Sequence, residues 1–135
     1  LDDVGGEAAL ASLVERHSAE GVEIDLFVEL APENEAGQRY ESHLEDTVYR
    51  LVQESLNNAI RHGKAARAIV EVIDEEDEIR IRVADDGIGF DPNRPGGGFG
   101  LLGMRERVKL SAGRFEIRSG EQGTTITAAL PARRL

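Results

Sequence analysis

Two segments of the chain carry the alternating pattern of paired β-strands, and each requires a sheet. In the first, RAIVEVIDEEDEIRIRVADDG, apolar and charged residues alternate near 67–73 and near 79–84, on either side of an acidic turn. In the second, RFEIRSG and GTTITAALP flank another short turn. Alternation of this kind is typical of half-buried strands. Both segments are therefore predicted to be β-hairpins.

Helical patterns lie between these strand patterns. Helices are predicted over residues 7–19, from about 43 to 62 and from about 101 to 111, and a further strand is predicted in GVEIDLFVEL. The order is helix, strand, helix, two strands, helix, two strands. Helices interspersed with hairpins favour an α+β fold. We expect a two-layer sandwich in which about three helices cover one face of a mixed sheet of about five strands, with residues 1–135 forming a single domain.

Composition and charge narrow the class of function. The formal net charge is −10, which is the opposite of the basic surface that a nonspecific nucleic-acid binder needs. The chain has no cysteine, so disulfides and thiolate metal sites are excluded. No apolar run approaches a membrane span, and LDDVGGEAAL resembles no signal peptide. We expect a cytoplasmic domain and, because an initiator methionine is lacking, a piece of a longer protein.

Polar residues on the long predicted helix form the first candidate site. The segment VQESLNNAIRHG places Asn57 and Asn58 inside the helix, although asparagine is a poor helix former. Glu54 and Asn58 are four residues apart and lie on one face, where a carboxylate and an amide oxygen suit Mg²⁺. Arg61 continues this stripe, and with His62 it could meet anionic oxygens. The alternative is a solvated outer face of the helix.

The segment DDGIGF forms the second candidate site. Asp85 directly follows a predicted strand, and Gly87 and Gly89 let the backbone approach a ligand closely because they lack Cβ atoms. A carboxylate there can accept a hydrogen bond from an exocyclic amine while the glycines make room for a flat ring. The alternative is an ordinary turn, since Asp-Gly is a common turn pair.

A glycine-rich stretch follows and runs into the third predicted helix. GGGFGLLGMRERV leads into a helix start, where free N–H groups favour phosphate. Within it, GFGLLG matches the dinucleotide fingerprint only formally, because it follows a Pro/Gly loop instead of a strand. A Walker A loop and the serine/threonine kinase signatures are absent.

Taken together, three motifs resemble a known family. QESLNNAIRH, DDGIGF and GFGLLGMRERV, in this order and at this spacing, resemble the catalytic and ATP-binding domain of sensor histidine kinases, in particular the subfamily with a Gln-Glu pair in the N box. The wider superfamily has a Bergerat-type ATP-binding fold and includes type II topoisomerases, mismatch-repair ATPases and heat-shock chaperone ATPases. The likeness covers nearly the whole chain.

The resemblance assigns roles to the polar helix residues. Asn58 matches the asparagine that coordinates Mg²⁺, and Glu54 matches a position that serves the metal or catalysis; both are the expected catalytic residues. Arg61 and His62 match positions that approach phosphates or ribose. Asn57 matches a tolerant position and is interpreted as non-functional.

The resemblance also assigns roles to the glycine-rich motifs. Asp85 matches the aspartate that binds the adenine amino group, with Gly87 and Gly89 beside it. Thr124 resembles a strand threonine that helps to hold adenine through water. Four residues match the G2 box: Gly98, Gly100, Leu101 and Gly103. Residues 91–99 are expected to form an ATP lid with weak order in the absence of nucleotide.

What the resemblance implies is an enzyme that uses ATP and Mg²⁺ to phosphorylate a histidine on a separate dimerisation domain of the same protein, with a response regulator as an indirect partner. The Arg-Glu-x-His-Asp context of such an acceptor is absent, and neither His17 nor His43 is expected to replace it. The isolated domain is expected to be monomeric and the full protein a homodimer, which can be anchored in a membrane.

Three alternatives remain open. The first is an anti-sigma-type serine kinase of the same fold, which binds a protein antagonist. The second is an ATP-gated clamp module of the topoisomerase or mismatch-repair type, although such modules carry longer lids and a following transducer domain. The third is a degenerate module that binds partners without catalysis, against which the intact Asp85, Asn58 and glycines argue.

Overall fold

The computed structural model describes residues 5–31, 40–89 and 100–132. The predicted lid over 91–99 and the G2-box residue Gly98 therefore lie outside the described residues. The elements, in chain order, are α1 (Gly5–Ser18), β1 (Glu23–Glu29), α2 (Ser42–Arg61), β2 (Arg67–Glu75), β3 (Glu78–Asp85), α3 (Leu101–Leu110), β4 (Arg114–Gly120) and β5 (Gly123–Pro131). Every predicted helix and strand is present, with ends within two residues of those expected.

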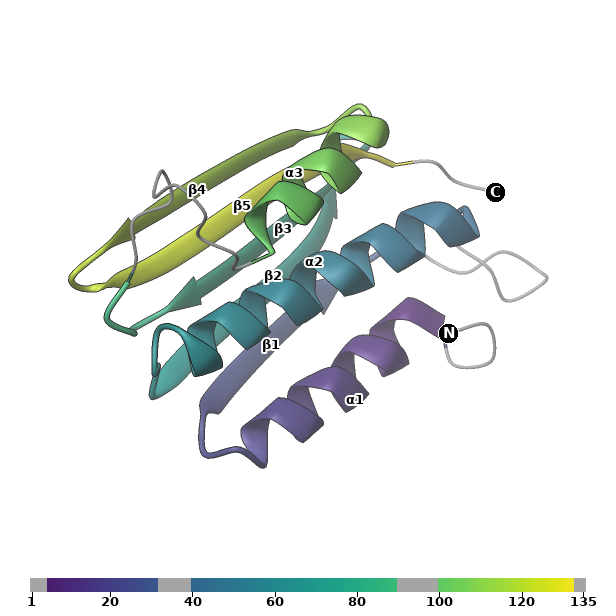
Figure 1. Ribbon diagram of the computed structural model, residues 1–135. Helices are drawn as coiled ribbons and strands as arrows, with labels where there is room; N and C mark the ends of the chain where they lie inside the picture. The colour runs from purple at the N-terminus through teal and green to yellow at the C-terminus, as the bar shows by residue number, and fades with distance from the viewer. Residues whose placement is uncertain (1–4, 32–39, 90–99, 133–135) are drawn as a thin grey trace.

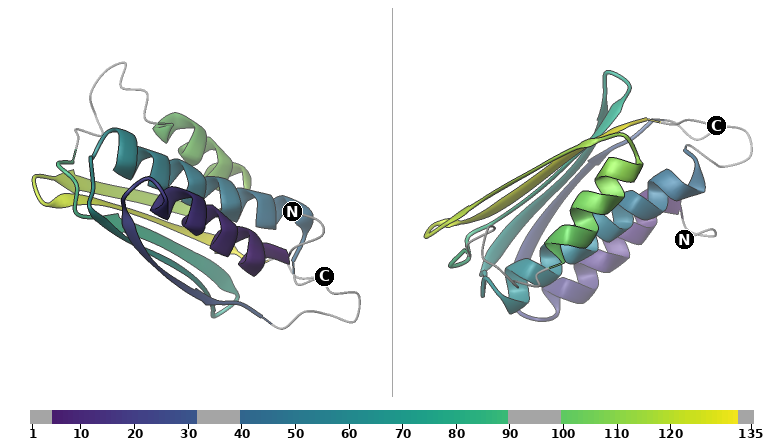
Figure 2. Two further views of the ribbon diagram at one scale, coloured as in Figure 1. Left: turned by 90° about the horizontal axis from the view of Figure 1, so that it is seen from below. Right: turned by 45° about the horizontal axis from the view of Figure 1, so that its top comes forward.

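The described strands form one mixed sheet in the order β1-β2-β3-β5-β4. Strands β1 and β2 are parallel, and α2 makes the connection between them, whereas every other neighbouring pair is antiparallel. Figures 1 and 2 show the three helices side by side on one face of this sheet. The predicted α+β sandwich is confirmed.

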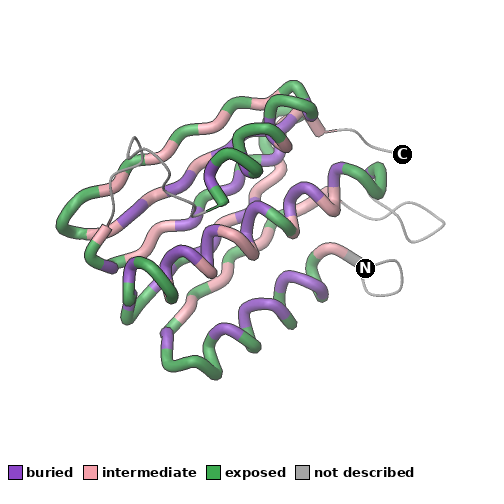
Figure 3. Tube along the Cα trace, viewed as in Figure 1, coloured by how far each residue is buried: buried purple, intermediate pink, exposed green. Residues whose placement is uncertain are grey.

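The core lies between the sheet and the helices. Figure 3 shows the buried positions of α2 along the side that faces the strands. Leu51, Val52 and Leu56 are at most 1% exposed and pack in one cluster with Val70 and Val83. Because burial of an apolar side chain of this size stabilises by about 1.5–3 kcal/mol, this face of α2 holds the helix against the sheet. Its polar edge is left available for another role.

A buried polar contact joins α1 to α2. The two helices run in the same direction, since Gly6 lies near Glu45 at the start of both, and His17 meets Asn57 near their ends. The His17 ring nitrogens lie 3.0 Å from the Leu13 carbonyl oxygen and 3.0 Å from Asn57 Oδ1. Asn57 therefore has a structural partner, and both ring nitrogens of His17 are already engaged.

No helix in the described part of the chain is long and apolar enough to cross a bilayer.

Candidate functional site

Asp85 ends strand β3, and its carboxylate is fixed by two backbone amides. Oδ1 accepts hydrogen bonds from Gly87 N at 2.8 Å and from Thr124 N at 3.3 Å. The part of the chain that the structure describes donates no hydrogen bond to Oδ2. Burial raises the pKa of Asp85 above its usual value, against the opposing effect of the two amides. The site therefore presents a held, partly desolvated carboxylate with one acceptor oxygen to spare.

The two glycine positions in the turn after Asp85 have no room for a side chain. A Cβ on Gly87 would lie 2.5 Å from the Gly63 carbonyl oxygen, and one on Gly89 would overlap the Gly120 carbonyl oxygen. Ile88 N donates to Gly63 O at 2.8 Å. The two glycines are thus required by close packing against the backbone of Gly63, which follows the polar stripe of α2, and of Gly120, and their predicted approach to a ligand stays a prediction.

Thr124 lies beside Asp85 on the neighbouring strand. The two residues are register partners in the β3–β5 pair, and Thr124 is 4% exposed. Its Oγ1 lies 2.6 Å from Ser119 Oγ. Ser119 thus orients the predicted adenine-side threonine, a role that the sequence could not reveal without the β4–β5 register.

The polar stripe of α2 borders this turn. Asn58 is 4% exposed, and its side-chain Nδ2 is buried without a hydrogen-bond partner. Since the two ends of an asparagine amide are assigned from hydrogen bonds, one buried atom of this amide lacks a partner among the described residues whichever way the amide is turned. Glu54 is half-buried, and its Oε2 lies so close to Gly100 that a Cβ there would be 2.5 Å away. Glu54 therefore connects the stripe to the start of α3.

Of the remaining predicted site residues that the structure describes, three are exposed and one is buried. Arg61 and His62 are exposed at the end of α2. Leu101 is 7% exposed and packs in the core as the first residue of α3. Gly103 is exposed, and a Cβ there would meet nothing within 4 Å. Backbone crowding thus supports Gly87 and Gly89 as required glycines but gives no reason for a glycine at 103.

The metal prediction was tested against the donors present. Among the described residues, no group of three or more His, Cys, Asp or Glu side chains is placed to hold a metal ion. The predicted metal donors on α2 are one amide, that of Asn58, and one carboxylate, that of Glu54. Mg²⁺ is commonly bound by one or two protein oxygens together with substrate phosphates and water. The donor set therefore fits a magnesium ion that arrives with a nucleotide and does not fit a closed protein site.

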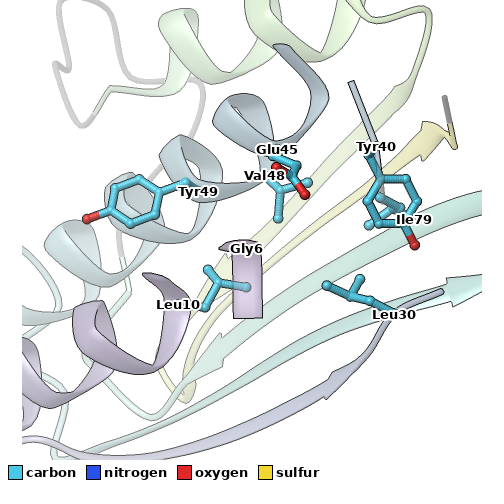
Figure 4. Close-up of a pocket in the computed structure, with 8 residues that line it drawn as sticks. All are labelled: Gly6, Leu10, Leu30, Tyr40, Glu45, Val48, Tyr49 and Ile79. Atoms are coloured by element: carbon cyan, nitrogen blue, oxygen red, sulfur yellow. The ribbon is translucent and has the colours of Figure 1, made fainter. Parts of the chain in front are cut away.

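A small apolar cavity lies elsewhere and does not compete as a nucleotide site. Figure 4 shows its lining residues at the start of α1, the first half of α2 and the sheet. They are Gly6, Leu10, Leu30, Tyr40, Glu45, Val48, Tyr49 and Ile79. Its volume of about 20 Å³ holds a single water at most.

Comparison with known proteins shows the family of the chain. Residues 43–134 match the family of histidine kinase-, DNA gyrase B- and HSP90-like ATPases. The chain belongs to this ATPase family. An ATPase domain of this type implies nucleotide binding, and the matched range contains every predicted site residue.

Curated relatives agree with this assignment. The chain is 38% identical to the signal transduction histidine-protein kinase/phosphatase DegS of Brevibacillus brevis, over 70% of the chain and 25% of DegS. It is 34% identical to the sensor histidine kinase MctS of Rhizobium johnstonii, over 97% of the chain and 28% of MctS. The chain thus spans about a quarter of the length of these relatives.

A solved structure supports the fold. The histidine kinase domain of the Erythrobacter litoralis blue-light activated histidine kinase superposes with a TM-score of 0.70 at 18% identity, covering 94% of the chain and 58% of that domain. At this identity the likeness concerns the fold, which is that of histidine kinase ATPase domains.

Proposed function

We propose that the chain binds Mg·ATP and transfers the γ-phosphoryl group to a histidine on a separate dimerisation domain of the same protein. The observation that carries the proposal is the Asp85 carboxylate. Two backbone amides donate to its Oδ1, and none of the described residues donates a hydrogen bond to its Oδ2. The two glycines beside it pack closely against the backbone of Gly63 and Gly120. A flat ring with an exocyclic amine complements this arrangement, and the family of the chain binds nucleotide.

In the base subsite, Asp85 accepts a hydrogen bond from the adenine amino group through Oδ2. Gly87 and Thr124 keep the carboxylate in place through their amides. Thr124 is in turn oriented by Ser119 and holds the ring through a bridging water. Guanine presents a carbonyl where adenine presents its amine, so the same carboxylate rejects GTP.

In the phosphate subsite, the polar edge of α2 faces the triphosphate. Asn58 and Glu54 would hold the magnesium ion, and Arg61 and His62 would approach the anionic oxygens. The ion, when bound, neutralises the charge that develops on the phosphate oxygens. Catalysis by this chain then consists of positioning and charge stabilisation, with Glu54 at the junction between α2 and α3.

The chemical step needs an acceptor from outside this chain. An imidazole nitrogen attacks the γ-phosphorus, the bond to the β,γ-bridging oxygen breaks, ADP leaves and the imidazole proton passes to a base or to water. His17 is unsuited to this role because it is buried and both of its ring nitrogens are engaged. We place the acceptor on the dimerisation domain of a homodimeric, cytoplasmic kinase module, with a response regulator that receives the phosphoryl group from it.

The test combines binding with labelling. The chain should bind Mg·ATP but, incubated alone with labelled ATP, it should not become labelled. Adding the dimerisation domain as a separate polypeptide should give slow labelling of that domain, because tethering normally supplies an effective concentration on the order of millimolar. The label should be acid-labile and base-stable, as expected for phosphohistidine.

Three results would contradict the proposal. Label on His17 or His43 of the isolated chain would place the acceptor inside it. Acid-stable label on a serine of a partner would favour the anti-sigma-type kinase. Tight binding of GTP would remove the adenine role of Asp85.

A further inference from the structure

The turn after β3 carries a second carboxylate whose partners lie on a different strand. Asp86 Oδ1 accepts hydrogen bonds from Ala66 N at 2.8 Å and from Arg67 N at 2.9 Å. The backbone of Asp86 also donates to Arg67 O at 3.2 Å. These amides lower the pKa of Asp86, whereas burial raises that of its neighbour Asp85. The adjacent aspartates are therefore used in opposite ways: one faces the ligand and the other holds the chain.

The segment that Asp86 holds is the one that follows the polar stripe of α2. Residues 62–66 connect α2 to β2. At its far end this connection is tied to Asp86 through Ala66 and Arg67. Nearer the helix, Gly63 O accepts from Ile88 N, and Gly87 packs directly against Gly63. Ala65 N in addition donates to Ala59 O inside the last turns of α2.

The turn that carries Asp85 and the helix that carries Asn58 are thus fastened to each other at two points along one short connection. The Gly63 contact is between backbone atoms and survives most substitutions. The Asp86 contact combines one backbone hydrogen bond to Arg67 O with two hydrogen bonds that depend on its side chain, and that side chain is exposed. A solvent-exposed carboxylate with two backbone donors is ordinarily a local structural device. Here it joins the turn that carries Asp85 to the connection that follows α2.

We propose that Asp86 is a positioning residue that fixes the spacing between the base subsite at Asp85 and the phosphate subsite on α2. The proposal rests on the proposed function, because it assumes that one nucleotide spans both subsites. Loss of the hydrogen bonds between the Asp86 carboxylate and the amides of Ala66 and Arg67 should leave each subsite intact but should misplace the two subsites relative to each other. A ligand that fills only the base subsite should then be insensitive to Asp86, and one that fills both should be sensitive.

The experiment compares two ligands on the intact chain. Dissociation constants for adenosine and for Mg·ATP are measured for the parent, for Asp86→Ala and for Asp86→Asn, which keeps an acceptor oxygen in the same place. We expect Asp86→Ala to weaken Mg·ATP binding on the order of tenfold and adenosine binding by less than about twofold, since small misplacements of a bound ligand have large effects. Asp86→Asn should restore most of the Mg·ATP affinity.

Two further variants make the result decisive. Asp86→Glu keeps the charge but moves the carboxylate by one methylene, so it should weaken Mg·ATP binding even if Asp86→Ala fails to fold. Tyr40→Phe removes a buried hydroxyl at the opposite end of the molecule and should leave the ratio of the two affinities unchanged although the fold is weakened.

Each outcome separates the two proposals. If the parent binds neither ligand, the proposed function fails. If the parent binds both and the Asp86 variants bind Mg·ATP as the parent does, Asp86 is not a positioning residue. Equal losses for adenosine and Mg·ATP would show that Asp86 merely supports Asp85, which would also overturn the spacing proposal.

Discussion

The two ends of the sheet hold their neighbouring segments in different ways. At the end that carries Asp85, the closest approaches are between backbones: Gly87 packs on Gly63, and Gly123 packs on the Asp85 carbonyl, while the Asp86 side chain adds hydrogen bonds to backbone amides. At the opposite end a side chain makes the connection. The Tyr40 hydroxyl donates to Asp74 Oδ2 at 2.5 Å and accepts from Ala31 N at 2.9 Å.

This difference separates the requirements of function from those of folding. Backbone contacts bring the segments close without filling the space with side chains, and this leaves a surface that a flat ligand can approach. A tyrosine fills the space itself and so closes it. We therefore expect substitutions at the site end to affect nucleotide binding, and substitutions at the other end to affect stability alone.

The largest effect should come from Gly123→Ala. Gly123 has a φ of +125°, and a Cβ there would overlap the Asp85 carbonyl oxygen. Backbone strain costs about 1–3 kcal/mol, and overpacking typically adds about 1–3 kcal/mol. The free energy of unfolding, measured in urea, should fall by several kcal/mol, and the folded fraction should bind ATP poorly because Asp85 is displaced.

Gly103→Ala provides the matched control for stability. A Cβ at this helical position meets nothing within 4 Å, so the higher helix propensity of alanine should leave stability equal or raise it by up to about 1 kcal/mol. If both variants lost the same stability, crowding at the site end would not explain the glycines.

The next largest effect should come from Asp85→Asn, and it should appear in binding and not in folding. Replacing a charge-assisted hydrogen bond should weaken ATP binding by roughly 1.5–3 kcal/mol. The pKa of Asp85 is raised by burial, so the folded state holds the proton more tightly than the unfolded state. The resulting stabilisation is present at low pH and is lost as the pH rises through the folded pKa.

At neutral pH the ionised Asp85 therefore opposes folding, and an asparagine that still accepts from Gly87 and Thr124 should relieve this. Thermal unfolding at pH 7 should give a melting temperature equal to or above that of the parent, while calorimetry shows weaker ATP binding. A lower melting temperature together with unchanged affinity would assign Asp85 a structural role.

Much of the fold could be predicted from the sequence because each element has its own pattern. The alternation in β2 and β3 and the apolar arc of α2 are local features, and the acidic turn between the strands marks the hairpin. The parallel pairing of β1 with β2 was not predicted strand by strand, because it depends on which way the chain turns after α2. That information lies in long-range packing and not in any one segment.

The candidate site, too, could be predicted only in part from the sequence. Asp85, Asn58 and the glycines could be proposed from motifs, and the geometry brings Asp85 and Thr124 together and places Glu54 beside Gly100. Ser119 and Gly63 could not be proposed, because their roles arise from strand register and from contact between distant turns. In the sequence, Asp86 is only the second residue of an Asp-Asp pair. The sequence alone does not indicate which of the two side chains accepts hydrogen bonds from Ala66 and Arg67.

A moderate effect confined to stability should come from Tyr40→Phe at the opposite end. Tyr40 is 2% exposed, and removing its hydroxyl leaves Ala31 N and Asp74 with one partner fewer. Unsatisfied buried polar groups cost about 1–3 kcal/mol each. The free energy of unfolding should fall within this range, and the dissociation constant for ATP, measured where the variant is fully folded, should not change. A weaker ATP affinity would mean that the two ends are coupled.

The smallest effect should come from removing a salt bridge on the open face of the sheet. Arg82 pairs with Glu71 at 3.0 Å across β2 and β3, midway between the ends, with both side chains partly in solvent. Such pairs contribute about 0–1 kcal/mol and are screened by salt. Arg82→Ala should therefore lower the free energy of unfolding by less than about 1 kcal/mol at low ionic strength and by less still at about 0.5 M salt, where the Debye length is only about 4 Å, and it should leave ATP affinity unchanged. A loss that exceeds that of Tyr40→Phe, or one that does not shrink with salt, would show that Arg82 and Glu71 do not behave as a solvent-screened surface pair.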